Sequence, residues 1–357
     1  MKKNHASSKG SLSRRKLIAA AGAGALVAPS LLSRAAQAQE NVVYINTYGG
    51  SWTNAEIEAY IKPFTQETGI TVRTVTPVVT AKRKAQVVSK NYEWDFCTID
   101  GGEYEFAKNE GLLEPIDHSV VDVSKIPKEN IQGDCVIAAV ALTFALVYRK
   151  DKYPQGPKNW ADFWDVKKFP GSRSFYNRPW TALGQALIAD GVPVDKVYPM
   201  DLDRAFKKMD QIKPHVKVWW EQNTQAQQLI KDGEVDMIQM ATARAQELID
   251  QGVPIEIVWH GAETHWSYWF VSKGSPRAKA AWKFIDLASR PDRQAAFCNL
   301  LPYGPSHPDA FKFIDAATAN KLPTKPEHLK EAFFPDPLWL GPRLDALKER
   351  WTQWLAT

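Results

Sequence analysis

The sequence predicts an α/β protein of two lobes, each a mainly parallel sheet flanked by helices. One observation is length: the 319 residues that follow a predicted leader (357 − 38) exceed the roughly 250 to 300 residues at which one hydrophobic core usually stops growing. The other is pattern, because short β-branched runs alternate with amphipathic stretches along the chain. Ligands of such sheets collect at the carboxyl ends of strands, so the residues after each run are candidates for a site.

Residues 1–38 are predicted to be an export signal that is removed. A basic start leads into the apolar stretch Leu17–Leu32, and Ala36-Gln37-Ala38 gives a small-x-small cleavage site. The run Ser13-Arg14-Arg15-Lys16-Leu17-Ile18 resembles a twin-arginine signal, with an ordinary secretory signal as the alternative. The apolar stretch is too short to span a bilayer comfortably. We therefore expect a periplasmic mature chain without stable membrane insertion.

Strand, loop and helix alternate over the first part of the mature chain. The first and third expected strands are β-rich runs that end at Gly-bearing turns, the first expected helix is amphipathic, and the second is basic. The expected elements are a strand at 42–45, a turn at Tyr48–Ser51, a helix at 54–68, a strand at 70–75, a helix at 82–89, and a strand at 94–99 that stops at Asp100-Gly101-Gly102.

The rest of the chain continues the alternation after a long apolar extended segment, Cys135–Tyr148, and a Pro/Gly-bearing boundary at Lys150–Pro157. Pro at the start of the last two helices fits the first-turn preference. The expected strands are 172–176, 216–220, 235–240, 255–259 and 266–271, and the expected helices are 160–164, 181–189, 201–213, 223–231, 276–289 and 291–300.

Charge and cysteines exclude two classes of function. The leader holds seven Lys/Arg and no acid, so 45 − 7 = 38 positive residues face 40 acids and the mature net charge is −2. A nucleic-acid role is therefore not expected. The three cysteines, Cys97, Cys135 and Cys298, allow at most one internal disulfide and show no metal-ligand spacing. We expect neither a metal nor a cofactor, and whether a disulfide forms stays open.

The order of short motifs over roughly 300 residues resembles the polyamine-type family of bacterial extracellular solute-binding proteins. The motifs that carry the resemblance are Phe64–Ile70, Asp95 before Asp100-Gly101-Gly102, Lys108–Asp117, Asn159–Asp165, Asp232–Asp236, Gly252–Trp259 and Pro302-Tyr303-Gly304-Pro305.

The resemblance implies a type II periplasmic-binding-protein fold with one solute held in a cleft between the lobes. It implies a monomeric receptor that delivers its solute to an ABC permease and its ATPase in the inner membrane. The first lobe would be 39–146 plus 267–306, and the second 147–266 plus 307–357.

Aromatic residues are the first candidates for solute contact. Among 14 tryptophans, Trp52 and Trp266 fall where the resemblance puts the cleft, with Tyr48 and Tyr268 beside them, and such rings offer stacking surfaces. The alternative is that these rings fill the core. Trp219 and Trp220 alternate across a strand, so at most one of them should face the cleft; Trp220 is our candidate, although the choice between them is open.

The carboxylates that hold ammonium groups in polyamine receptors are missing, because the matching positions read Arg178, Thr181 and Tyr268. Arg178 and Arg244 can instead fork onto a carboxylate, phosphonate or sulfonate. The alternative for Arg244 is an ion pair with Glu247. Backbone amides at Asp100, Gly101 and Gly102 would add dipoles. We expect a small organic anion or zwitterion, and a genuine spermidine or putrescine receptor remains the alternative.

An enzyme is the disfavoured reading from another class. The chain has no G-x-S-x-G motif. His260 and His265, five apart with Glu263 between them, do not match HExxH, and we interpret them as loop histidines. No Tyr-Tyr pair suggests a ferric-ion site.

Overall fold

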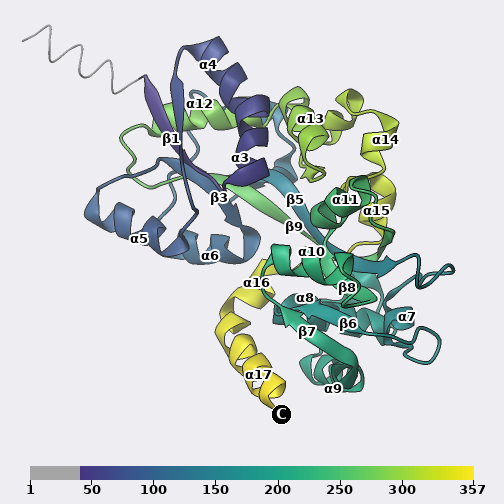
Figure 1. Ribbon diagram of the computed structural model, residues 1–357. Coiled ribbons are helices and arrows are strands. Elements are labelled where there is room, and N and C mark those ends of the chain that lie inside the picture. The colour runs from purple at the N-terminus through teal and green to yellow at the C-terminus, as the bar shows by residue number, and fades with distance from the viewer. Residues whose placement is uncertain (1–40) are drawn as a thin grey trace, which may run out of the picture.

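The computed structural model describes residues 41–357, so the predicted export signal lies outside the described residues. Its secondary structure forms two lobes joined by long strands (Figure 1). No helix among the described residues is long and apolar enough to cross a membrane.

One continuous mixed sheet runs through both lobes in the order β2-β1-β3-β9-β5-β8-β6-β7, with β4 and β10 paired to β5. The pairs β1–β2, β1–β3, β6–β7 and β6–β8 are parallel, whereas β5 and β9 run antiparallel through the middle. Three parallel strands thus lie at each end, as the sequence predicted. The strands are β1 Val42–Asn46, β2 Thr71–Val75, β3 Phe96–Asp100, β4 Ile131–Gln132, β5 Val136–Arg149, β6 Arg173–Tyr176, β7 Val216–Trp220, β8 Met237–Ala241, β9 Ile255–Val271 and β10 Gly304–Pro305.

β9 corrects the prediction of two strands with a loop between them. Its 17 residues pair with β5 across two register shifts, so His260 and His265 lie in a strand. Gly261 makes this possible, because its φ is +71° and a Cβ there would lie 2.6 Å from the ring of Trp160. The Gly261 carbonyl also accepts a hydrogen bond from the Trp160 indole at 2.8 Å.

Helices cover both faces of the sheet (Figure 1). The predicted set lacked α6 and α11, and it also lacked the C-terminal helices α14 to α17. Two of these begin directly after a strand, α6 after β3 and α11 after β8. The larger helices are α3 Gly50–Glu56 and α4 Lys62–Thr68 (joined by the π-helical turn Ile57–Ile61), α5 Thr80–Ser89, α6 Gly101–Asn109, α8 Pro179–Ala189, α9 Leu202–Ile212, α10 Asn223–Lys231, α11 Thr242–Asp250, α12 Ala278–Ala288, α13 Pro291–Leu300 and α17 Leu344–Ala356. The short ones are α7 Trp160–Trp164, α14 Ala316–Ala319, α15 Pro326–Lys330 and α16 Pro337–Leu340.

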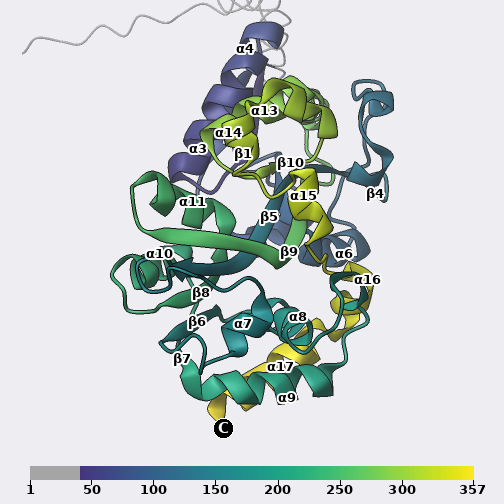
Figure 2. The same ribbon diagram turned by 90° about the vertical axis from the view of Figure 1, so that its right-hand side faces the viewer.

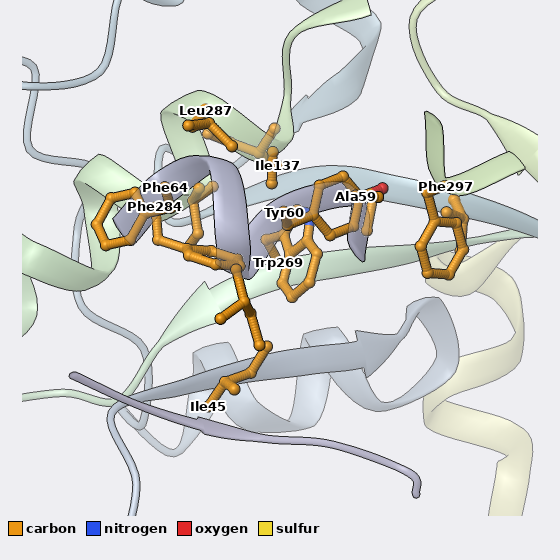
Figure 3. Packing of buried hydrophobic residues seen from close by; sticks show 14 of the residues in the cluster. Ile45, Ala59, Tyr60, Phe64, Ile137, Trp269, Phe284, Leu287 and Phe297 are labelled. Atoms are coloured by element: carbon orange, nitrogen blue, oxygen red, sulfur yellow. The ribbon is translucent and has the colours of Figure 1, made fainter. Parts of the chain in front are cut away.

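Each lobe has its own aromatic core. In the first, Trp269 of β9 packs against Tyr60 and Phe284, and the rings of Phe64 and Phe297 extend this cluster to either side (Figure 3). In the second, Trp160, Phe163 and Phe175 pack together.

The C-terminal chain contributes to both cores, whereas the sequence prediction assigned all of 307–357 to the second lobe. Ala310 and Leu322 pack in the first core, and Phe333 and Trp351 pack in the second. Figure 2 shows the last helix, α17, lying beside α8 and α9, where Phe206 of α9 contacts Trp351. The segment between the two cores includes α16, which contacts α6 of the first lobe.

Candidate functional site

A cavity of about 480 Å³ opens to solvent where the end of β3 and the middle of β9 meet the start of α8 and the α16 segment. The register of the sheet builds it, because Asp100, the last residue of β3, pairs with Ser267 of β9. Six of the ten residues predicted to contact a solute line this cavity, namely Asp100, Gly101, Gly102, Arg178, Trp266 and Tyr268.

Asp100 ends β3 and caps α6. Its Oδ1 accepts a hydrogen bond from the Gly102 amide at 2.9 Å, and its Oδ2 lies 3.1 Å from His265 Nε2 and 3.7 Å from Arg178 Nη2. Burial alone would raise the pKa of this carboxyl, but the His265 imidazolium, the Arg178 guanidinium and the Gly102 amide together hold the pKa well below its usual range. Asp100 is therefore an ionised carboxylate, and the Gly102 amide that we expected to face a solute is already occupied.

Arg178 caps α8 and points its charge at the cavity. Its side chain is only 13% exposed, and its guanidinium carbon lies 4.5 Å from the centre of the Trp180 ring. The nearest carboxylate oxygen, on Asp100, is 3.7 Å away, beyond hydrogen-bond length. Within residues 41–357, the Arg178 guanidinium donates no hydrogen bond. A guanidinium carries five N–H donors, so this group is held in place by its ring contacts while its donors stay available to a bound group.

His265 and Glu263 were missed as site residues because they were placed in a loop. His265 lines the cavity and stacks on Phe144 of β5 with the ring centres 6.0 Å apart. Its Nδ1 lies 3.3 Å from Oε1 of Glu263, whose side chain is fully buried. Burial alone would lower the pKa of the imidazole, but the charges and contacts of Asp100 and Glu263 raise it above its usual value. The sequence did contain a signal for this pair, because Glu263 and His265 are two positions apart and residues i and i+2 of a strand share a face.

The other missed residues form the apolar walls of the cavity. Trp180 follows Arg178 in α8, and Phe334, Pro337 and Leu340 come from the segment that carries α16. These residues lie far apart in the sequence, so no local pattern joined them.

Four predicted residues lie outside this cavity, and two of them belong to the core. Trp52 is 7% exposed and packs edge-on against Phe297 and Tyr303. Trp220 is 1% exposed, stacks on Tyr176 with the ring centres 4.2 Å apart, and donates its indole N–H to the Gln239 carbonyl. These two rings fill the core, which was the alternative considered for the aromatic residues.

The other two are Tyr48 and Arg244. Tyr48 is 51% exposed and rests edge-on against Trp52. Arg244 pairs with Glu247 at 2.6 Å within α11, as its structural alternative predicted. Trp219 also faces away from the cavity, because its ring stacks on Phe175 and meets Trp351 of α17.

Potential metal and thiol chemistry does not explain the cavity. Among residues 41–357, no group of three His, Cys, Asp or Glu side chains is arranged to hold a metal ion, and this includes the array of Asp100, His265 and Glu263. Cys97, Cys135 and Cys298 are free thiols, all buried, which answers the open question of a disulfide.

Comparison with known proteins identifies relatives over nearly the whole described chain. The sequence model of the bacterial extracellular solute-binding protein family matches residues 59–326. A γ-aminobutyric acid (GABA)-binding protein of Pseudomonas aeruginosa is 33% identical over 331 residues, which cover 90% of this chain and 93% of that protein.

Solved structures agree with this result. An ABC transporter substrate-binding protein from Bradyrhizobium japonicum has a TM-score of 0.84 at 32% identity, covering 88% of this chain and 99% of that one. A GABA receptor has a TM-score of 0.80 at 34% identity, with 88% and 98% covered. A periplasmic binding protein of Agrobacterium tumefaciens in complex with agropinic acid has a TM-score of 0.76 at 33% identity, with 88% and 99% covered. The spermidine/putrescine-binding protein of Streptococcus pneumoniae shares the fold at 17% identity.

Proposed function

The chain belongs to the bacterial extracellular solute-binding protein family, and we propose from this premise that its cavity captures a small solute bearing a carboxylate. It is the substrate-binding component of an ABC importer. The solute class we propose is an organic anion or a zwitterion such as an ω-amino acid.

The Arg178 guanidinium is the observation that carries this proposal. It is 13% exposed, is oriented by the Trp180 ring and donates no hydrogen bond to the residues 41–357. A carboxylate can pair with two of the guanidinium N–H donors in a fork, and such charge-assisted hydrogen bonds are stronger than neutral ones. A solute carboxylate at this position would therefore gain charge-assisted hydrogen bonds that the protein itself leaves unmade.

A polyamine fits the same cavity poorly. Its ammonium groups would lie beside Arg178 and the His265 imidazolium, and like charges at close range in a poorly solvated site are repelled by several kcal/mol. Asp100 offers a carboxylate, but His265 at 3.1 Å already engages it. Two related proteins named for GABA and one solved with agropinic acid support a carboxylate ligand for this chain.

Capture would couple to closure of the lobes. Asp100 ends a strand of the first lobe and Arg178 begins a helix of the second, yet both line one cavity. We propose that the solute bridges the lobes, that a hinge in β5 and β9 closes them, and that an ABC permease with its ATPase recognises the closed monomer in the periplasm. Trp266 and Tyr268 would pack against the solute.

A thermal-shift and calorimetry panel tests the proposal. The protein is unfolded and refolded to remove carried-over solute, then exposed to γ-aminobutyrate, succinate, glycine betaine, putrescine and spermidine. A solute at 100 times its Kd should add about 2.7 kcal/mol to the free energy of unfolding. We expect stabilisation by carboxylates, its loss in Arg178→Met, and its retention in the matched control Arg290→Met, since Arg290 pairs with Glu67 on the surface. Stabilisation by the polyamines alone would refute the proposal.

A further inference from the structure

The buried carboxylate of Glu263 has no role in the fold that its contacts explain. Its side chain is fully buried, and neither oxygen accepts a hydrogen bond from the residues that the structure describes. Its nearest cation is the His265 ring, 3.3 Å away. A buried carboxylate without such a cation would be strongly destabilising, so Glu263 and His265 have to be considered as one unit.

The charges around His265 favour a proton on its ring. Asp100 approaches from the end of β3 at 3.1 Å, and Glu263 approaches from β9 at 3.3 Å. Among residues 41–357, the cation that opposes the proton is Arg178, from the start of α8. Glu263 also acts electrostatically on the hydroxyl of Tyr198, which is buried and makes no hydrogen bond among the described residues.

The charged groups near the Tyr198 hydroxyl also belong to the electrostatic surroundings of Glu263 and His265. Burial is the largest cause that raises the pKa of Tyr198. The charges of Glu263 and Asp336 raise the pKa further, and the charge of Arg178 lowers it. Tyr198 is therefore neutral and adds no charge, and Asp336 adds a further negative charge. Asp100 and Glu263 both contact the His265 ring and one guanidinium opposes them, so the imidazolium form of His265 is favoured and the pKa of the ring is raised.

We propose that His265, held as an imidazolium between Asp100 and Glu263, is the positioning residue that makes this cavity select carboxylate solutes, and that capture weakens as the ring loses its proton. The inference rests on the proposed function. While His265 is charged, it engages Asp100 and leaves the Arg178 guanidinium for the solute. Once His265 is neutral, Asp100, already 3.7 Å from Arg178, competes with the solute for that guanidinium, and the cavity becomes more negative by one charge.

The direction of the pH effect follows from linkage. The His265 pKa is raised above its usual value, so the charged form persists to a higher pH than in an ordinary histidine and is lost as pH rises through the raised pKa. A bound carboxylate favours the proton further. If a bound solute raises the His265 pKa by one unit, the affinity of the protein for that solute falls about tenfold as pH rises through the titration of His265.

Glu263→Gln tests the inference, because the amide keeps the shape of the side chain and removes its charge. Glu256→Gln is the matched control, since Glu256 lies on the same strand but is half-exposed beside Lys150. The first readout is the NMR titration of the His265 Cε1–H in ligand-free protein, assigned with His265→Gln. The second is the Kd for γ-aminobutyrate by calorimetry from about pH 5 to 9.

We expect His265 to titrate above its usual value in wild type and in Glu256→Gln, and at a lower pH in Glu263→Gln. The pH at which γ-aminobutyrate affinity is lost should move down with it. An ordinary or lowered His265 pKa in the wild type overturns the inference, and so does a pH profile of affinity that is the same in Glu263→Gln. If γ-aminobutyrate and succinate bind at no pH while His265 titrates above its usual value, the proposed carboxylate ligand is wrong. Selection of carboxylates by His265 is then wrong as well, although the charged array of Asp100, His265 and Glu263 is present.

Discussion

We expect removal of the buried ion pair between Asp95 and Arg277 to lower the free energy of unfolding strongly. Asp95 is fully buried directly before β3, and its carboxylate accepts from the Tyr44 amide at 2.8 Å and the Ser275 hydroxyl at 2.6 Å. The Arg277 Nε lies 2.9 and 2.8 Å from its two oxygens. These contacts join β1, the start of β3 and the turn before α12, and so fix the strand that ends at Asp100.

Arg277→Met removes the charge of the 13%-exposed arginine and keeps most of its apolar stem. The Asp95 carboxylate would keep two hydrogen bonds and lose its cation. Breaking a buried pair from one side costs about 3–5 kcal/mol. The matched change is Arg290→Met, whose arginine pairs with Glu67 at the surface with side-chain exposures of 40% and 48%, and pairs of that kind contribute about 0–1 kcal/mol.

Urea unfolding followed by both circular dichroism and tryptophan fluorescence measures the difference. We expect a lower midpoint in Arg277→Met with an unchanged slope, and little change in Arg290→Met. In the double variant Asp95→Asn/Arg277→Met, the loss should be smaller than the sum of the two single losses, because the buried charge has gone as well. Equal losses in Arg277→Met and Arg290→Met would refute the reasoning that burial decides the strength of these pairs.

Two further predictions concern the aromatic support of the cavity and the buried thiols. Trp180→Leu removes the ring that lies 4.5 Å from the guanidinium carbon of Arg178, so we expect the Kd for γ-aminobutyrate to weaken about 2- to 30-fold by calorimetry. Trp180→Phe should recover part of that loss, and an unchanged Kd in Trp180→Leu would contradict the assigned role. Burial raises the pKa of Cys97 to about 12, and Cys135 and Cys298 are buried as well, so Ellman's reagent should react with no thiol in native protein and with three per chain in denaturant. Rapid reaction of the native protein would show that a lobe opens locally.

The sequence predicted the parallel strands well because their signal is local. The runs that became β1, β2 and β3 are β-rich and end at turn residues, so position and direction could be read from a few residues. It missed α6, which opens with two glycines that favour no helix. That helix begins because Asp100 caps it through the Gly102 amide, and a cap of this kind looks like a turn in the sequence.

The candidate site was only partly predictable because long-range pairing assembles it. Asp100 and His265 are 165 positions apart (265 − 100), and they meet because β3 pairs with β9 in the register that sets Asp100 opposite Ser267. No local pattern specifies that register. The aromatic candidates show a second limit of sequence analysis. Trp52 and Trp220 are residue types that are common at binding surfaces, yet both fill the core. The sequence indicated which types of side chain the site requires. The strand pairing determines which individual residues of those types reach the cavity.

The charges of the cavity also set how closure depends on solute. By the predicted boundaries Asp100 belongs to the first lobe and Arg178 to the second, and the two lie 3.7 Å apart. Their attraction favours the closed form, but 3.7 Å is beyond hydrogen-bond length and His265 already engages Asp100 at 3.1 Å, so we expect this pair to contribute little. Changing a population from 1:99 to 99:1 requires about 5.5 kcal/mol of differential binding. Under the proposed function, the ion pair alone would therefore be too weak to hold the lobes shut, and a solute carboxylate bound to Arg178 would supply most of the difference. Closure would then indicate a bound solute, which is the signal that the proposed permease would recognise.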